Sequence, residues 1–410
     1  MSSTKRGFII GVLFLSLAIL GCAKRETPKP PETGTPEAET LGRMMFDTPT
    51  PISDVGTVDT PRLLEIPGGT THLVYLMHDG VSQRVMYSRM ENGEFTKPSQ
   101  LSQEEGTKTG GAFIAPESES DFIAYWVNLT VTGGRLIYKK SDNGGKTFTF
   151  EKQWNKRNEV RWPCVLRVGN EVVAYFFVRT RKGWELAMNR NFSAEDEPTI
   201  DSTEASPFHL QGVTDGARKV WLAYFERQPN ADGGRIAFLT STDGGMKFSR
   251  KYLFEDKVIG SIYSFFQIVR SVPRGKGTLH VIFTEESPEE TILYYARSED
   301  DGANFTTPVA MITSEEPLTH APVILANGSY VFIATADTEE EGPALRYVLS
   351  EDGGKTFSAP AIATRNVANP ETIAGTLSSK GNVMLVWDDL AGTTEVGEQI
   401  YRLNGKLRGR

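Results

Sequence analysis

The sequence of 410 residues predicts an all-β protein built as a single β-propeller of seven blades. A short turn motif recurs along the chain with a period of about 50 residues, which is typical of propellers and other repeat arrays. Each repeat also contains a run rich in Val, Ile, Tyr, Phe and Trp, the residues that favour strands. No segment shows a sustained helical period of apolar residues, which favours strands throughout.

The turn motif has the pattern Ser-x-Asp/Asn-x-Gly-x-x-Phe, with clear copies at residues 141–148, 241–248, 298–305 and 350–357. Asp or Asn turns the chain by bonding its own backbone, and Gly accepts a positive φ angle without steric strain. Each copy therefore predicts the tip of a β-hairpin. We interpret its aspartates as turn formers rather than as ligands or acids.

This motif resembles the Asp-box of sialidase-like (BNR-repeat) β-propellers. Four copies make the resemblance specific for the fold. In that superfamily the boxes lie on outer hairpins, away from the ligand face, so the motif does not by itself imply an activity. Sialidases have six blades, which makes six the alternative to the seven predicted here.

The repeat can be counted from the motif phenylalanines Phe148, Phe248, Phe305 and Phe357, which are 100, 57 and 52 residues apart. The first gap covers two periods, and weaker copies at residues 88–95, 188–192 and 401–407 fill the missing positions. Seven apolar runs predict the second strand of each blade: Leu73–Met77, Phe122–Val127, Val172–Val178, Val220–Phe225, Leu279–Thr284, Tyr330–Thr335 and Val383–Trp387.

The ends of the chain predict how the ring closes. A Phe-x-x-Pro pattern follows the motif at residues 95–98, 305–308 and 357–360, and it also occurs at residues 46–49, where no repeat precedes it. The last repeat, conversely, lacks an outer strand. We therefore expect Phe46–Ser53 to supply the outer strand of the final blade, which would remove the exposed sheet edges of an open array.

The first 42 residues predict a membrane anchor. Lys5 and Arg6 precede an apolar run from Phe8 to Leu20, which has the length of a signal-peptide core and is short for a membrane span. The run ends before Cys22 in a sequence that resembles a lipoprotein cleavage box. The resemblance implies a signal peptide at 1–21, a lipidated Cys22 and a flexible tether at 22–42, rich in Pro and Glu, before the propeller at 43–410.

Composition narrows the partners. The formal net charge of −8 includes Lys5 and Arg6, so signal cleavage would leave about −10, which argues against a nucleic-acid partner. With Cys22 assigned to lipid, Cys164 has no disulfide partner, and we expect it to be a buried strand residue. No His/Cys/Asp cluster has the spacing of a zinc site. We expect no metal, no cofactor and a monomeric chain.

Polar residues gather where the predicted innermost strands begin and the second strands end. In propellers of this class these positions form the ligand face. They are Arg62, Asp79, Asn128, Arg161, Arg179, His209, Glu226, Arg227, Tyr263, Glu285, His320, Asp337, Glu371 and Asp388. This set predicts a small-molecule or glycan site, and the alternative is a rim that is polar because it is solvated.

Resemblance to sialidases implies a sharper hypothesis for this face. Sialidases use a tyrosine nucleophile, which a glutamate activates, together with an aspartic acid/base and three arginines that clamp a carboxylate. Arg62 lies where the family has an Arg-Ile-Pro motif, although Leu63 and Leu64 follow it here. The remaining roles would fall to Asp79 as acid/base, Glu226 and Tyr263 as nucleophile pair, and Arg161, Arg179 and Arg227 as clamp.

The competing hypothesis is a binding propeller without catalysis. Trp126, Trp221 and Trp387 lie within predicted second strands and are expected in the core, whereas Trp162 and Trp184 flank strand ends and suit stacking on a sugar ring. Trp162, His320 and Asp337 are further ligand-binding candidates on this face. We predict an envelope lipoprotein that recognises a glycan or protein ligand there. The alternative is an exo-acting glycoside hydrolase of sialidase type. The residue after Cys22 is Ala23 and not the aspartate that resembles an inner-membrane retention signal in enteric bacteria, so we expect the outer membrane or cell surface.

Overall fold

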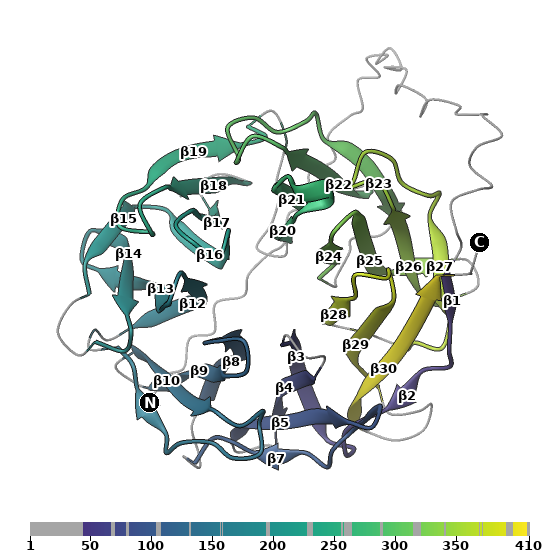
Figure 1. Ribbon diagram of the computed structural model, residues 1–410, viewed down its shortest axis with the longest axis horizontal. Helices are drawn as coiled ribbons and strands as arrows, with labels where there is room; N and C mark the ends of the chain where they lie inside the picture. The colour runs from purple at the N-terminus through teal and green to yellow at the C-terminus, as the bar shows by residue number, and fades with distance from the viewer. Residues whose placement is uncertain are drawn as a thin grey trace, which may run out of the picture. The chain divides into compact units, whose positions relative to one another are not determined.

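A computed structural model of the chain describes residues 44–407, with gaps at 67–69, 79–81, 104–107, 131–132, 156, 158, 194–196, 228–232, 256, 258–264, 288–289, 315–320, 340–341, 369, 371 and 391–396. The described residues belong to the unit formed by residues 40–410. They form seven antiparallel sheets arranged as blades around one axis (Figure 1). The predicted all-β propeller with seven blades is therefore confirmed.

Blades 1 to 3 follow one another along the chain. Blade 1 contains β3 (Thr57–Glu65), β4 (Thr71–His78), β5 (Gln83–Glu91), β6 (Glu94–Phe95) and β7 (Ser99–Gln100). Blade 2 contains β8 (Lys108–Pro116), β9 (Phe122–Thr130), β10 (Gly133–Ser141) and β11 (Lys152–Gln153). Blade 3 contains β12 (Val160–Val168), β13 (Glu171–Thr180), β14 (Gly183–Arg190) and β15 (Thr199–Thr203).

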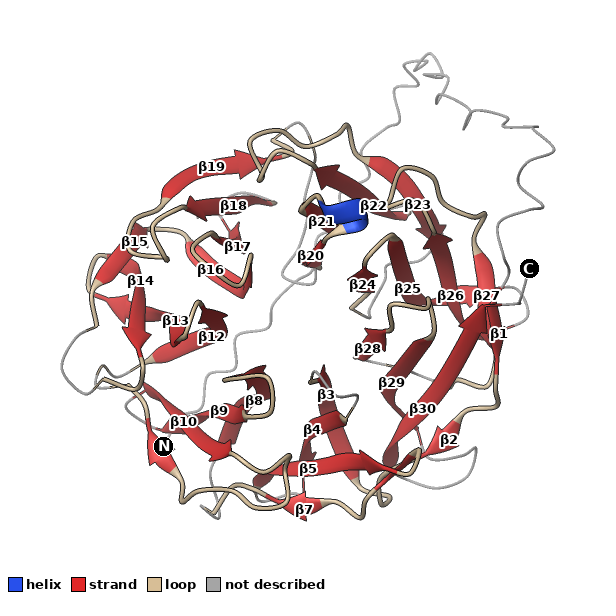
Figure 2. Ribbon diagram, viewed as in Figure 1, coloured by secondary structure: helices blue, strands red, loops and turns tan. Residues whose placement is uncertain are grey.

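Blades 4 to 6 repeat this order. Blade 4 contains β16 (Ser206–Thr214), β17 (Val220–Arg227), β18 (Gly234–Ser241) and β19 (Ser249–Leu253). Blade 5 contains β20 (Phe266–Ser271), β21 (Thr278–Glu286), β22 (Thr291–Ser298) and β23 (Val309–Ser314), with a 3-10 turn, η2, at Pro273–Gly275 (Figure 2). Blade 6 contains β24 (Val323–Asn327), β25 (Tyr330–Glu339), β26 (Gly342–Ser350) and β27 (Ala361–Thr364).

Blade 7 joins the two ends of the described chain. Its inner strands are β28 (Ile373–Leu377), β29 (Val383–Leu390) and β30 (Glu398–Leu407), and its outer positions are taken by β1 (Met44–Phe46) and β2 (Thr50–Pro51). Met44 pairs with Leu407 and Thr50 pairs with Arg402, both antiparallel. The predicted closure by an N-terminal outer strand is confirmed.

The turn predicted from one weak copy of the motif is wrong. Residues 401–407 were expected to turn, but they continue β30, and Asn404 pairs with Met384 inside the sheet. The side chain of Asn404 instead donates a 2.8 Å hydrogen bond to Asp47, on the N-terminal outer segment. Because the outer strand of this blade comes from the other end of the chain, no hairpin is needed here.

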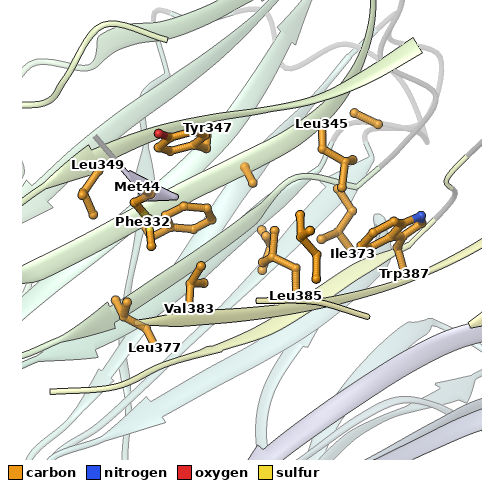
Figure 3. Close-up of a cluster of buried hydrophobic side chains, with 14 residues drawn as sticks. Met44, Phe332, Leu345, Tyr347, Leu349, Ile373, Leu377, Val383, Leu385 and Trp387 are labelled. Atoms are coloured by element: carbon orange, nitrogen blue, oxygen red, sulfur yellow. The ribbon is translucent and has the colours of Figure 1, made fainter. Parts of the chain in front are cut away.

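The core lies between successive blades, as expected for second strands that are buried on both faces. Trp126, Trp221 and Trp387 are fully buried, as predicted, and Cys164 is a buried free thiol. Figure 3 shows the cluster between blades 6 and 7, where Phe332 and Leu345 of one blade meet Leu385 and Trp387 of the next. Burying such apolar surface contributes about 25 cal/mol per Å².

In its four clear copies, the turn motif joins a blade to the blade before it. In the copy at 141–148, the Ser141 hydroxyl accepts a 2.8 Å hydrogen bond from the Gly145 amide. A Cβ atom at Gly145 would lie 1.6 Å from the hydroxyl of Tyr87 in blade 1. The second glycine of the motif is therefore required both for its positive φ angle and for this close approach. These contacts confirm the interpretation of the motif as a structural turn.

Candidate functional site on the link face

The ring has two different faces because every sheet is antiparallel. On one face lie the first residues of the innermost strands, the last residues of the second strands and the first residues of the third strands. We call this the link face, since the chain passes there from one blade to the next. The opposite face carries the motif turns, and we call it the turn face.

The innermost strands of blades 1 to 4 share an irregularity near the link face. In each of them the register with the second strand shifts, at Asp59/Arg62, Thr109/Ala112, Arg161/Cys164 and Phe208/Gln211. A residue with positive φ lies inside each shift: Thr60, Gly111, Trp162 and His209. Such bulges redirect side chains and often occur next to functional sites. The described innermost strands of blades 5 to 7 pair in regular register.

Arg62, directly after the first bulge, is the best candidate for binding an anion. Its side chain is half-buried, and among the described residues its guanidinium makes one hydrogen bond, 2.9 Å to the carbonyl of Pro61, and no ion pair. Its guanidinium carbon lies 6.0 Å from the centre of the Phe113 ring. Burial lowers the pKa of Arg62, although the charges of Asp388 and Asp59 oppose that shift.

The charge of Arg62 acts on side chains of other blades. Burial and then the charge of Arg62 lower the pKa of His209 to about 4, so the imidazole is neutral at pH 7. Trp162 lies against that imidazole, with 4.8 Å between ring centres, and 5.9 Å from Phe208. The link face thus brings a cation from blade 1 together with an aromatic group from blades 3 and 4.

Glu226, predicted to activate a nucleophile, lies in a saturated ion-pair network in blade 4. Its fully buried carboxylate accepts hydrogen bonds from Arg235 at 2.9 Å and from Arg250 at 2.6 Å. Thr203 and Tyr252 also donate to it. Burial alone would raise the pKa of Glu226, but the hydrogen bonds from Thr203 and Arg250 outweigh it and hold the pKa below its usual range. A carboxylate held in this way is a weak base.

Asp337 occupies the equivalent position in blade 6 and is held similarly. Ser314 donates a 2.7 Å hydrogen bond to its carboxylate, and Arg346 forms an ion pair with it at 2.6 Å. In blade 5 Glu285 pairs with Lys257 at 3.2 Å. Acidic residues at the ends of the second strands therefore fasten the links between these blades.

The three arginines expected to complete a clamp lie on blades 3 and 4, Arg161 on an innermost strand and Arg179 and Arg227 at the ends of second strands. Arg161, Arg179 and Arg227 are exposed, and Arg179 lies over the indole of Trp184, with 5.6 Å to the ring centre. No hydrogen bond or ion pair between described residues joins any of them to Arg62. The other site candidates, Asp79, Tyr263, His320 and Cys22, lie outside the described residues.

Sequence reasoning did not single out three groups near Arg62. Asp59 lies 3.9 Å from His78, and burial raises the pKa of Asp59 although His78 and Arg62 oppose the rise. Tyr125 comes from the second strand of blade 2, and its hydroxyl accepts a 3.3 Å hydrogen bond from the Val165 amide. Asp59 lies close to Arg62 in the sequence, with Pro61 between them, and this could have indicated it as a site residue. Nothing in the sequence indicates that Asp59 lies near His78. Within the described part of the chain, no group of three His, Cys, Asp or Glu residues is arranged to hold a metal ion.

The fold is similar to that of several glycan-active enzymes. A PL25 ulvan lyase bound to -[GlcA(1-4)Rha3S]- aligns with 88% of this chain and 95% of its own, at 9% identity and a TM-score of 0.55. Polysaccharide lyase Uly1 aligns with 91% of this chain and 95% of its own, at 10% identity and a TM-score of 0.53. The Hadza microbial sialidase Hz136 aligns with 68% of this chain and 63% of its own, at 12% identity and a TM-score of 0.47. No family model and no curated protein sequence matches the chain. At these identities the similarity shows the fold alone.

Proposed function

We propose that this propeller binds a carboxylate-bearing glycan on its link face, with Arg62 as the anchor for the carboxylate. The observation that carries the proposal is the half-buried guanidinium of Arg62, which has no carboxylate in ion-pair contact among the described residues. Burying a cation without an ion pair is unfavourable, and a ligand carboxylate would supply such a pair in addition to the charges of Asp388 and Asp59, which act on Arg62 without an ion-pair contact. The planar guanidinium also matches a carboxylate in a bidentate geometry.

The aromatic group beside Arg62 suits a sugar ring. Trp162 is half-buried, so one part of its indole packs on Phe208 and His209 while another part meets solvent. Indoles with this partial exposure are suited to contacts that combine apolar area with a polar rim. The neutral imidazole of His209 adds a hydrogen-bonding group without a second positive charge. The acidic sugar GlcA in the bound fragment of the similar ulvan lyase is consistent with a carboxylate ligand.

The proposal also places the protein in a bacterial envelope, attached to a membrane by a lipid on Cys22. Its support is the sequence: the apolar run at residues 8–20, the cysteine that follows it, and the Pro- and Glu-rich tether. The described part of the chain contains no helix of the length and apolar character needed to cross a membrane. Metabolic labelling with a palmitate analogue tests the attachment, and a Cys22→Ala variant that still incorporates label would contradict it.

Binding of acidic glycans tests the central part of the proposal. Purified protein would be applied to an array that contains uronic and sialic acid glycans, alongside neutral glycans. We expect binding to acidic glycans, and a loss of about 100-fold in affinity in Arg62→Ala, because a charge-assisted pair is removed. Arg218→Ala is the matched control, since Arg218 is an exposed arginine on the turn face. Equal binding by both variants, or capture of a protein but of no glycan, would contradict the proposal.

A second candidate function is hydrolysis by an exo-acting glycosidase of sialidase type. The observation in its favour is Asp59, whose raised pKa suits a proton donor and whose charge acts on Arg62. Release of chromophore from aryl sialosides and other aryl glycosides would test it. Turnover that is lost in both Arg62→Ala and Asp59→Asn supports hydrolysis, whereas binding without turnover leaves the propeller as a recognition domain.

A further inference from the structure

We infer that the ligand is a polyanionic polysaccharide chain, which extends from Arg62 across the rim of blade 3 along a basic track. The track consists of five cationic side chains on the link face: Arg161, Arg179, Arg181, Lys182 and Arg227. This inference rests on the proposed function, since it takes the Arg62 site as the end of the track. It adds the size and charge pattern of the ligand.

The five cations differ from other cations of the same face. All five are exposed, and none forms an ion pair with a described residue. Other link-face cations are neutralised: Arg157 pairs with Glu185 at 2.8 Å, and Arg346 pairs with Asp337 at 2.6 Å. Exposed cations that keep their charge free are available to an anionic partner.

Strand pairing makes the track continuous from the aromatic group outwards. Arg161 directly precedes Trp162 and pairs with Phe177 in β13, two residues before Arg179. Residues two apart in a strand share one face of the sheet, so the two guanidinium groups are diagonal neighbours. The hairpin that follows β13 then presents Arg181 and Lys182.

The other end of the track reaches blade 4 through Trp184. Arg179 lies over the Trp184 ring, and Trp184 pairs with Thr203 in β15. Thr203 donates a hydrogen bond to Glu226 at the end of β17, and Arg227, which follows Glu226 on the opposite face of that strand, is the last cation of the track. A second indole therefore lies within the track, so that cations alternate with aromatic surface as they would along a chain of charged sugars.

The local charge is opposite to that of the molecule. Glu159 and Glu204 are the acidic side chains beside the track among the described residues that no arginine or lysine neutralises, so five cations face two carboxylates. The whole chain has a formal charge of −8. A positive track on an acidic protein attracts a polyanion locally, while the remaining charge disfavours long nucleic acids.

A membrane surface fits this track less well than a polysaccharide. Surfaces that insert into lipid combine cations with exposed apolar side chains. The described large apolar residues that are exposed include Phe150 and Val309, and none of them lies in the hairpin of blade 3. Charge without an apolar face favours a hydrated anionic polymer.

Binding of polygalacturonate chains of increasing length tests the inference, with neutral dextran as the uncharged probe. We expect affinity to rise with chain length and to fall as salt is raised, because several charge contacts form at once. The variant Arg179→Glu/Arg181→Glu/Lys182→Glu should lose about tenfold or more of its affinity for long chains, while binding of monomeric galacturonate stays unchanged.

A matched variant changes three charges on the turn face: Lys146→Glu/Lys247→Glu/Lys355→Glu, all exposed. Equal losses in the two triple variants would reduce the effect to net charge and overturn the track. Affinity that does not depend on chain length would do the same. Tighter binding to duplex DNA, or to vesicles containing phosphatidylserine, than to polygalacturonate would overturn the assignment to a polysaccharide. Loss of monomer binding in Arg62→Ala separates a failed track from a failed Arg62 site.

Discussion

The link face and the turn face of the propeller treat their polar side chains differently. On the turn face, the motif aspartates are fully engaged: Asp352 accepts hydrogen bonds from the amides of Lys355 at 2.8 Å and Thr356 at 3.0 Å. On the link face, Arg62 has no ion pair with a described residue, although it is half-buried. The first arrangement fixes the backbone, and the second leaves a charge available to a ligand.

Residue type alone does not separate structural from functional groups on the link face. Glu226 and Arg62 both lie on the link face, and both were candidates for chemistry. Two arginines pair with the Glu226 carboxylate, whereas no described carboxylate lies in ion-pair contact with Arg62. Paired charges stabilise the fold, and a half-buried charge that lacks an ion pair among the described residues is a candidate for the site.

Breaking the Glu226 network should have the largest effect on stability. Glu226→Gln leaves Arg235 and Arg250 without their buried carboxylate, and we expect a loss of about 3 kcal/mol in the free energy of unfolding. The control is Glu285→Gln, whose partly exposed pair with Lys257 should contribute about 1 kcal/mol or less. Urea denaturation measures both. A fully stable Glu226→Gln that loses glycan turnover would instead make Glu226 catalytic.

Adding a side chain at a motif glycine on the turn face should have the next largest effect on stability. Gly145→Ala would place a Cβ atom 1.6 Å from the Tyr87 hydroxyl, and we expect it to destabilise the protein by about 2–3 kcal/mol. Its neighbour Gly144 also has a positive φ, but a Cβ there meets nothing within 4 Å. Gly144→Ala should therefore have only the backbone effect of about 1 kcal/mol. Equal thermal stability of the two variants would contradict the proposed contact between blades.

Stability should depend on pH through the fully buried His72 and His280, in addition to the half-buried His209. Burial and then Arg89 lower the pKa of His72 to about 4, and burial and then Arg297 lower that of His280 to about 3. Below pH 6.5 the unfolded chain binds protons that the folded chain excludes. The free energy of unfolding should therefore decrease as the pH is lowered, by about 1.4 kcal/mol per pH unit for each histidine.

His280→Gln tests this dependence. Urea unfolding of the variant and of the parent protein between pH 7 and pH 5 should give a shallower fall for the variant, by about one proton. The variant also loses the 2.8 Å hydrogen bond to Tyr295, so the slope rather than the absolute stability is decisive. Parallel slopes would mean that His280 titrates in the folded protein as it does in the unfolded chain, which would contradict its lowered pKa.

Much of the fold could be predicted because it depends on local chemistry. The Ser-Asp-Gly turns, the apolar second strands and the Phe-x-x-Pro segment at residues 46–49 each carry their own signal, and together they predict seven blades and their closure. The weak copy at residues 401–407 misled because Asn-Gly also occurs inside strands. Its surroundings, an outer strand from residues 44–51, are set by the other end of the chain.

The site could be predicted less completely because it depends on register and on contacts across the ring. Arg62 was predicted at the start of an innermost strand, and Trp162 was predicted beside a strand end. The bulges at Thr60, Trp162 and His209 were not expected, since a shift of register leaves the apolar pattern of a strand almost unchanged. Nor does the sequence indicate that Arg62 in blade 1 acts on His209 in blade 4.

Thermal unfolding of two arginine variants tests whether Arg62 serves a ligand rather than the fold, and it needs no ligand. Arg402 is buried, donates a 2.8 Å hydrogen bond to the carbonyl of Gly93 and pairs with Glu94 at 3.2 Å, so, unlike Arg62, it forms an ion pair with a described residue. We predict that Arg402→Met lowers Tm, whereas Arg62→Met leaves it unchanged or raises it, because a half-buried cation with no ion pair among the described residues is removed. A drop in Tm for Arg62→Met as large as that for Arg402→Met would show that Arg62 stabilises the fold, and it would contradict its assignment to a ligand site.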